Sequence, residues 1–590
     1  TVPGSGEGTT LPTDLDPGCA VHLMTTVPVG SHGTGGEEAT PGPSGPTGTS
    51  SSIDTALGTF VDELPDGTTV LLAGLGHVEG RAGATLLVVH PVGAVAAGTG
   101  GPGSQGDSTG AALTSGSTQQ RSLVQLTDLT ATLLQLVGAG GPLPEAVAGQ
   151  PVVAVGDGPD TGHLEDARDL AAGITLAKVA APWVLGTVAA VHLALLVLSI
   201  ARRRQRASAP PGRTGGLSVV ATAVLAIPAA TFLTGLVPWW GFVRPVAALS
   251  LGVLVAVGLV TAVAWAGPWR RQPLGPAAVV AAITLAVVGA DVICSARLGL
   301  VSVLGLQPVT AGRFYGQGNV GFGIVLGSFL VLAAAVIGDR PAARPAARPA
   351  TGPADGPEVS RPAAAGAILL LGAAAVLLNA APQAGADFGG VPALVVATGL
   401  MALAALGIRW SAGALALLGL AGVVVAAGVM LLDWTRGPGR RTHLGDFVQR
   451  VVDGTALQVV TRKLEQSLGI LLSYPLSWLA VLALVLLALA VWRRPAGWTA
   501  PLWRHEGMHR ALLAGVVATT LGWVLNDSGI AVVALALTVL LAAALSLIGS
   551  EPPRTDDGPA PGGLQLVPGA VAPERPGDGP PSAVDPRRDG

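Results

Sequence analysis

The chain has 590 residues, of which half are apolar and only 12% are charged, and its formal net charge is −3. This composition is typical of a protein that crosses a membrane many times, and not of a soluble globular domain. Acidic residues gather in the first 180 residues, where eighteen Asp and Glu stand against four Lys and Arg, a charge of −14. Such a segment repels phosphates, which argues against nucleic acid as a partner.

The segment before the long apolar runs divides into two parts. Residues 1–52 are rich in Gly, Pro, Ser and Thr without periodicity, so we expect a flexible segment there. Residues 53–180 alternate helical and extended patterns, which predicts a small α/β layer domain. The expected elements are a helix at 53–64, strands at 68–73, 85–90 and 122–126, a Gly-rich loop at 98–116, and a helix at 129–137 with Asp128 as its N-cap.

Part of this domain resembles a known superfamily. The run from Leu113 to Thr118, the run from Leu123 to Leu134, and then Gly138 and Pro142 are similar to the C-terminal part of the alkaline-phosphatase/sulfatase superfamily. Active members of that superfamily are two-metal phospho- or sulfo-hydrolases with a Ser, Thr or Cys nucleophile. The resemblance therefore implies a partial alkaline-phosphatase-like α/β ectodomain in residues 53–180.

The catalytic motifs of that superfamily are not intact in this sequence. The strand at 68–73 should be followed by an Asp-His-Gly metal motif, but the chain continues as Gly-Leu-Gly and then His77. A histidine without an adjacent carboxylate is a weak metal ligand, so we expect no divalent metal and no other cofactor, and we assign no catalytic residue. No counterpart of the nucleophile strand precedes Ile53, so we expect the sequence to be a fragment with a catalytically silent ectodomain.

Residues 182–548 form a block of apolar runs separated by short breaks. A helix needs about 20 apolar residues to cross the hydrocarbon core, and in lipid its backbone groups must be paired within the segment. The block is therefore predicted to be mainly α, a polytopic membrane helix bundle with about eleven spans. The expected spans are 182–201, 216–236, 243–266, 275–296, 318–338, 362–381, 391–408, 412–432, 469–492, 509–526 and 530–548.

Arginines at the ends of these spans predict which side each end faces. Arg202–Arg206 contains four arginines directly after the first span, and positive residues mark cytoplasmic ends. Alternating from there puts four further basic segments inside, including the Pro-Ala-Arg-rich linker at 339–361. We therefore expect a multi-pass cell-membrane protein with an extracellular N-terminal segment and a disordered cytoplasmic tail at 549–590.

One loop on the predicted outer side, residues 434–468, breaks the charge rule because it carries six basic residues. Its apolar residues lie along one helical face, which predicts an amphipathic helix in the membrane interface. The cations either meet lipid head groups or hold an anionic substrate, and the sequence leaves both interpretations open. The candidate substrate-binding residues of this loop are Arg440, Arg441, Arg462 and Lys463.

Polar residues and glycines also gather at the predicted outer ends of the spans. Arg313, Tyr315 and Asn319 lie in the segment Ala-Gly-Arg-Phe-Tyr-Gly-Gln-Gly-Asn, whose glycines would let backbone N–H groups approach an anion. Asp291 lies inside a span, where a charge costs about 2.5–3.5 kcal/mol, so it should be paired or face a cavity. Such turns can simply cap helices, but their shared side favours an outer pocket. The candidates for proton handling or ion pairing are Asp291, Asp387, His443 and Asp527.

These turns carry a second resemblance. The segments AGRFYGQGN, GADFGG and NDSG, with Thr442–Gly445 and Arg462–Leu464, are similar to a family of multi-span proteins of Gram-positive bacteria that fuse a phosphatase-like ectodomain to such a membrane block. The likeness covers nearly all of residues 53–548. It implies architecture and a location in the cell envelope rather than a particular chemistry.

Three functions follow as hypotheses. The leading one is an envelope protein that handles or supports an anionic, phosphate-bearing or lipid-linked compound at its outer face, with membrane lipids as partners. The second is a secondary transporter or flippase with Asp291 as its coupling site. The third is a non-enzymatic membrane scaffold. The sequence contains no Walker A or CxxC motif. Because the phosphatase-like metal motif is not intact, an enzymatic activity is not the favoured interpretation.

Overall fold

The computed structural model describes residues 55–74, 85–91, 111–137, 147–155, 162–205, 215–339, 360–437 and 441–550, with gaps at 56, 86, 148, 312, 382–383, 442 and 527–528. The predictions for residues 1–52, His77, Arg440, Asp527, most of the linker and the tail beyond Ser550 fall outside the described residues. The same holds for the side chain of His443.

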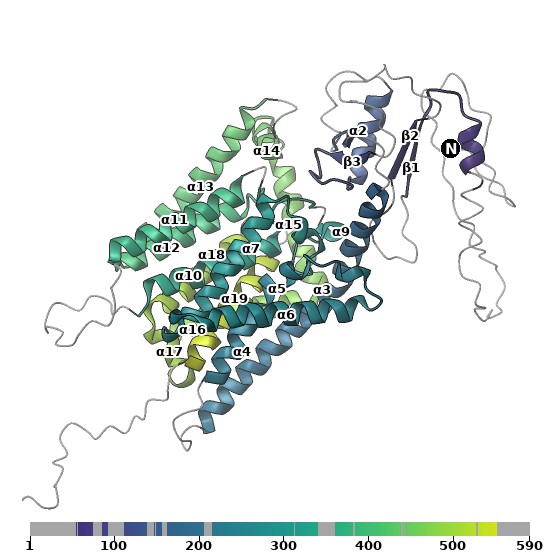
Figure 1. Ribbon diagram of the computed structural model, residues 1–590. Coiled ribbons are helices and arrows are strands. Elements are labelled where there is room, and N and C mark those ends of the chain that lie inside the picture. The colour runs from purple at the N-terminus through teal and green to yellow at the C-terminus, as the bar shows by residue number, and fades with distance from the viewer. Residues whose placement is uncertain are drawn as a thin grey trace, which may run out of the picture. The chain divides into compact units, whose positions relative to one another are not determined.

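Two small antiparallel sheets and two helices make up most of the described part of the head, which we define as residues 55–155 (Figure 1). One helix covers residues 57–62, within the range predicted for it, and the other is α2 (Leu126–Leu136). Strand β1 (Thr69–Ala73) pairs with β2 (Leu87–Pro91), and β3 (Ala112–Ser115) pairs with β4 (Val152–Val155). β1 and β2 confirm the strands predicted from the apolar runs. A larger α/β layer, as the superfamily resemblance implied, is not seen among the described residues of the head.

The strand predicted at 122–126 is wrong, and so is the N-cap assigned to Asp128. Ser122 has a left-handed φ of 63° and belongs to a turn, whereas the strand of this region is β3, inside the predicted loop. Helix α2 (Leu126–Leu136) begins earlier, with Gln125 as N-cap and Asp128 at the third helical position of a capping box. The carboxylate of Asp128 is fully buried and accepts hydrogen bonds from Ser115 Oγ, Gln125 N–H and Gln150 N–H.

The first membrane helix, α3 (Gly162–Gln205), begins twenty residues before its predicted start at Pro182. Proline is tolerated inside a membrane helix when its surroundings satisfy the freed carbonyl. The additional turns are held by Leu170 and Ile174, which are buried against a cluster that includes Leu300 and Leu306. The helix therefore crosses the expected boundary between the head and the membrane block.

Among the residues that the structure describes, eight helices are long and apolar enough to cross a membrane. They are α3, α6 (Pro245–Ala266), α7 (Gly275–Ile293), α10 (Asn319–Ile337), α11 (Arg361–Ala380), α13 (Ala412–Trp434), α18 (Glu506–Leu525) and α19 (Ile530–Ser550).

Two bent pairs raise the number of spans to ten if each pair crosses once. Helices α4 (Gly215–Leu225) and α5 (Ile227–Thr234) meet at 46°, and α15 (Ala456–Ser473) meets α16 (Pro475–Arg493) at 96°. Helix α12 (Gly390–Leu406) has only 17 residues. In the described part of the chain, eight to ten helices that could span a membrane thus stand against the predicted eleven, and the chain is a multi-pass membrane protein.

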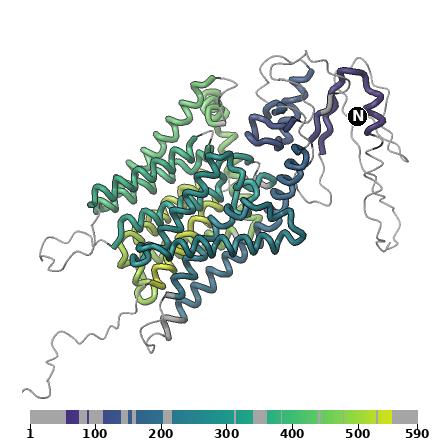
Figure 2. The backbone as a smooth tube through the Cα atoms, viewed as in Figure 1, coloured from purple at the N-terminus to yellow at the C-terminus, as the bar shows by residue number. Residues whose placement is uncertain are grey.

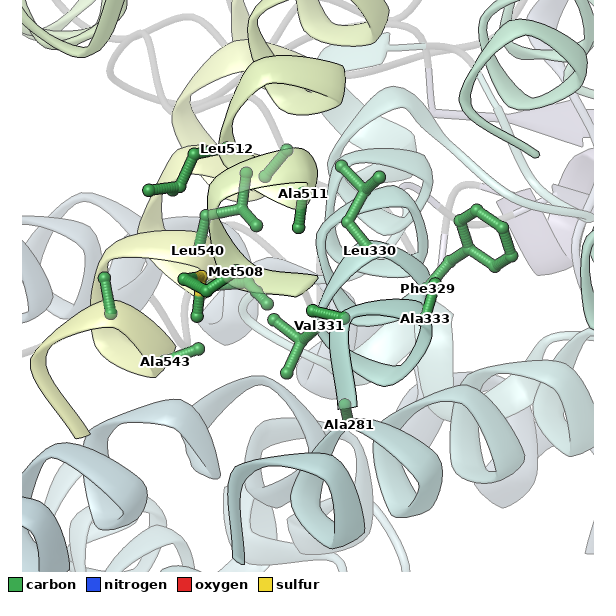
Figure 3. Close-up of a cluster of buried hydrophobic side chains, with 14 of the residues drawn as sticks. Ala281, Phe329, Leu330, Val331, Ala333, Met508, Ala511, Leu512, Leu540 and Ala543 are labelled. Carbon is green, nitrogen blue, oxygen red and sulfur yellow. The ribbon is translucent and has the colours of Figure 1, made fainter. Parts of the chain in front are cut away.

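Two helices, α10 and α19, occupy the interior of the bundle, in which the helices run side by side (Figure 2). In each, 78% of the most apolar window is buried, whereas the figure for α6 and α13 is 11%. Figure 3 shows part of this core, where Leu330 of α10 lies near Ala511 of α18 and Leu540 of α19, while Phe329 points to the other side of α10. A helix that is apolar on all sides is one that other helices surround.

Sidedness can be tested with the native Cys294, which is exposed at the end of α7. In a Cys19→Ser variant, we expect a membrane-impermeant maleimide to label Cys294 on intact cells, because this end of α7 is predicted to face outwards. In a chain with both native cysteines replaced by serine, an Arg271→Cys variant should react only after permeabilisation. The opposite pattern would overturn the predicted orientation.

Candidate functional site

Two turns that are distant in sequence touch each other through their backbones. One lies between α9 (Pro308–Ala311) and α10, and the other lies between α11 and α12. The N–H of Gln317 donates to the carbonyl of Gly385 at 2.6 Å. Gly316 has a φ of +77°, and a Cβ there would lie 2.3 Å from Gly385 O, so only glycine fits this approach. The two turns therefore lie against each other.

Arg313 lies at the centre of this contact. We define the Arg313 cluster as Arg313, Tyr315, Gln317, Asn379, Asp387 and Asp433. Its Nη1 donates to Gln317 O at 2.6 Å and lies 4.0 Å from Asp387 Oδ1. The side chain of Arg313 keeps 31% of its surface exposed, while that of Asp387 keeps 2%. The guanidinium therefore has a buried anchor on one side and access to solvent or a ligand on the other.

Asn379 positions the carboxylate that faces Arg313. Its Nδ2 donates to the carbonyl oxygen of Asp387 at 2.5 Å, and the N–H of Asp387 donates to Asn379 O at 3.1 Å. Asn379 itself is fully buried. The sequence places it as a lone amide at the end of an apolar run, a signal that could have identified it as a site residue.

Tyr315 and Asp433 extend the cluster towards a third turn. Burial raises the pKa of the Tyr315 hydroxyl above its ordinary value, Arg313 opposes this shift, and Asp433 adds to it. Asp433, at the end of α13, accepts a hydrogen bond from Gly445 N–H at 2.9 Å and lies 3.5 Å from Arg436 Nη1. The sequence prediction omitted Asp433 from the site, although it too is a single carboxylate at the end of an apolar run.

Asp291 holds the segment that follows α7 in place. Its two carboxylate oxygens accept hydrogen bonds from Leu298 N–H and Gly299 N–H, each at 2.8 Å. It thereby caps the short helix α8 (Arg297–Val301), which follows α7 through residues with left-handed φ angles. Asp291 and Gln317 also line one small cavity of about 10 Å³, about the volume needed for one water. Backbone N–H groups, and not an arginine, are therefore the partners of this buried carboxylate.

The head reaches the same turns through Gln120. Its Nε2 donates to Ser295 O at 2.5 Å and to Phe314 O at 3.0 Å, and the residue is buried. This one amide bridges the turn that follows α7 and the turn that carries Arg313. Gln120 therefore lies at the same end of the bundle as the Arg313 cluster, and which side of the membrane this end faces stays a prediction.

The basic loop forms two helices, α14 (His443–Val452) and α15. α15 exposes an apolar stripe and meets α16 at 96°, and its position in the membrane interface stays a prediction. Arg441 forms an ion pair with Asp446, with its Nε 2.9 Å from Asp446 Oδ1, whereas Arg462 and Lys463 are exposed. The exposed apolar residues of the stripe are Leu457, Val460, Leu464, Leu468 and Leu472.

Asn319 is the remaining site candidate in the described part of the chain. It is the first residue of α10 and is half-buried, two residues after Gln317. In the part of the chain that the structure describes, no group of three or more His, Cys, Asp or Glu side chains is arranged to hold a metal ion.

The arrangement offers a half-exposed arginine among buried polar groups at the end of a membrane bundle. Its guanidinium can donate to an anion while Gln317 and Asp387 hold it in place. Comparison with models of protein families, with curated proteins and with solved structures found no match to this chain.

Proposed function

We propose that this multi-pass membrane protein binds an anionic, phosphate-bearing or lipid-linked compound at the outer face of the cell membrane, through Arg313. The observation that carries the proposal is the position of this side chain. It keeps 31% of its surface exposed, while its Nη1 donates to Gln317 O and lies 4.0 Å from Asp387 Oδ1. A planar guanidinium has five N–H donors and matches the geometry of a phosphate. A rigidly held donor also loses little conformational entropy when the ligand arrives.

The exposed cations of the basic loop support the proposal by their charge. Arg436, Arg462 and Lys463 all have exposed side chains on the segment that follows α13. Basic residues at a membrane surface raise the local concentration of anions and attract anionic lipids. We assign them this general attraction, and we assign specific contact with the ligand to Arg313 and Tyr315.

For the head we propose a supporting role without catalysis. The resemblance to the alkaline-phosphatase superfamily would make it a partial ectodomain on the outside of the envelope, and its metal motif is not intact in the sequence. Gln120 supports a role at the turn of Arg313, because it bonds to the carbonyl of Phe314, the next residue in the chain. The head would then stabilise the binding site rather than carry out a reaction of its own.

The binding prediction concerns Arg313→Ala. We expect the variant to bind phosphatidylglycerol about tenfold or more weakly, because a hydrogen bond to a charged group contributes about 1.5–3 kcal/mol. Native mass spectrometry of the purified full chain with phosphatidylglycerol, and with phosphatidylcholine of the same acyl chains, measures the preference. Arg313→Lys should retain part of it, and Arg409→Ala, at the predicted inner side, should retain all of it. Equal phosphatidylglycerol binding by Arg313→Ala and the unchanged protein would contradict the proposal.

A transporter is the second candidate, favoured by the break between α4 and α5. The two helices meet at 46° at Ala226, and discontinuous helices are a feature of secondary transporters. This function predicts ion-gradient-dependent flux that persists in Arg313→Ala and is lost in Asp291→Asn. A scaffold would tolerate both substitutions, so the two variants separate the three hypotheses.

A further inference from the structure

A cavity of about 310 Å³ lies between α7, α10 and α11, beside the turn that carries Gln317. Helix α10 packs against both of the others. This volume falls at the lower end of the range of about 300–1,000 Å³ found for ligand pockets. The lining is apolar apart from Gln317, and includes Val292, Val325, Leu332, Ala375 and Leu378.

The cavity extends from the turn into one half of the bilayer. Its lining residues on α7 run from Ala282 to Val292, ten positions that span about 15 Å along a helix. A hydrocarbon core is about 30 Å thick, so this length corresponds to about one leaflet. Ala282 and Ala286 of α7 and Ala374 of α11 are exposed as well as lining, so the cavity opens between small side chains towards the lipid.

Gln317 closes the polar end of the cavity and lacks a hydrogen-bond acceptor there. The residue is 5% exposed, and no described residue accepts from its Nε2. A buried donor without an acceptor costs free energy, and a ligand oxygen at this position would remove that cost. The backbone oxygen of the same residue accepts the hydrogen bond from Arg313, so the donor lies beside the proposed anion site.

From this juxtaposition we infer that the cavity binds one hydrocarbon chain of a membrane lipid, with an ester or head-group oxygen of that lipid accepting from Gln317 Nε2. An apolar cavity of this size does not favour water, whereas a lipid chain can enter it from the bilayer. The inference rests on the proposed function and specifies it. The anionic compound is a lipid with its charge at Arg313 and one chain between α7 and α11.

Photo-crosslinking tests the inference with the full chain reconstituted in phosphatidylethanolamine vesicles. The probe is phosphatidylglycerol with a diazirine in one acyl chain, and the cross-linked peptides are identified by mass spectrometry. We expect labelling of Ala282–Val292 and Leu371–Leu378. A variant with Ala286→Phe and Ala374→Phe, which fills the opening, should reduce that labelling about tenfold.

The matched control carries Ala290→Phe and Ala373→Phe on the same two helices, where both alanines are exposed but do not line the cavity. It should label like the unchanged protein. Gln317→Leu should reduce labelling by the ester-linked probe but not by a diazirine alkane, which has no oxygen for the amide. Equal labelling of the filled variant and the control, or labelling of α7 and α11 no stronger than that of α6, would overturn the inference.

A second probe separates this inference from the proposed function. Diacylglycerol with the same diazirine chain has ester oxygens but no phosphate. If it labels the cavity as strongly as phosphatidylglycerol does, the chain site is supported while the anion preference assigned to Arg313 is refuted. If phosphatidylglycerol binds with a preference that depends on Arg313 but labels elsewhere, the proposed function stands and the cavity inference fails.

Discussion

Gly327→Leu in α10 is expected to lower the free energy of unfolding by about 2–3 kcal/mol, the upper part of the range for overpacked cores. A Cβ at Gly327 would lie 2.8 Å from Val539 Cβ and 3.0 Å from Ala536 O of α19. Gly323, one turn earlier, would bring a Cβ to 2.8 Å from Val532 O. Two glycines four residues apart thus let two helix backbones approach closely, as small residues do in membrane bundles.

The effect should be large because α10 and α19 form the most buried pair of helices, so neither can move outwards without disturbing the others. Equilibrium unfolding of the purified protein in mixed detergent and SDS micelles measures it. Gly258→Leu is the matched control, since Gly258 lies in the membrane helix α6 and a Cβ there meets nothing within 4 Å. If the two variants were equally stable, the close contact between α10 and α19 would be refuted.

Asp291→Ala is the second substitution for which we expect a large effect, a loss of about 2–6 kcal/mol in the free energy of unfolding. It leaves the N–H groups of Leu298 and Gly299 without their acceptor, and each buried donor that loses its acceptor costs about 1–3 kcal/mol. Asp291→Asn retains one oxygen acceptor and should lie between the unchanged protein and the alanine variant. The same unfolding titration in detergent and SDS tests this order.

The order of the Asp291 variants also bears on transport. If Asp291 were only a coupling site for protons, Asp291→Asn would unfold like the unchanged protein and lose flux alone. Asp453→Ala is the control, because Asp453 is an exposed carboxylate on the same predicted side, and its removal should change stability little. A full-stability Asp291→Ala protein would contradict the capping role.

The helices of the membrane block were predictable because their signal is local. A run of apolar residues must form a helix in lipid whatever its neighbours do. Three of the eleven predicted spans are not single long helices: two are the bent pairs, where Pro228 lies at the start of α5 and Pro475 begins α16, and the third is the 17-residue helix α12. Proline removes a backbone donor and bends the chain, which a hydropathy pattern does not register.

The amphipathic helix α15 was predictable for the same reason. Its apolar residues repeat at helical spacing within one short segment, so the exposed stripe follows from the sequence. The turn of 96° into α16 agrees with a helix that lies along the membrane surface.

The head was less predictable, because short strands depend on partners that lie elsewhere in the chain. β3 lies within the predicted loop because its four residues become a strand only by pairing with β4. Asp128 brings the two segments together by accepting hydrogen bonds from both Ser115 and Gln150. A helical N-cap and a buried hydrogen-bond acceptor look alike in sequence, and burial alone distinguishes them.

A polytopic helical protein with polar turns and a basic loop at the ends of its apolar segments follows from local sequence, since the transfer of apolar side chains into lipid depends on each segment alone. The packing of the helices, in contrast, places Arg313 between Gln317 and Asp387, lets Asp291 cap α8 and lets Gln317 close an apolar cavity. Those contacts join residues from separate turns. Which of them meet depends on how the helices pack, and no local pattern encodes that packing.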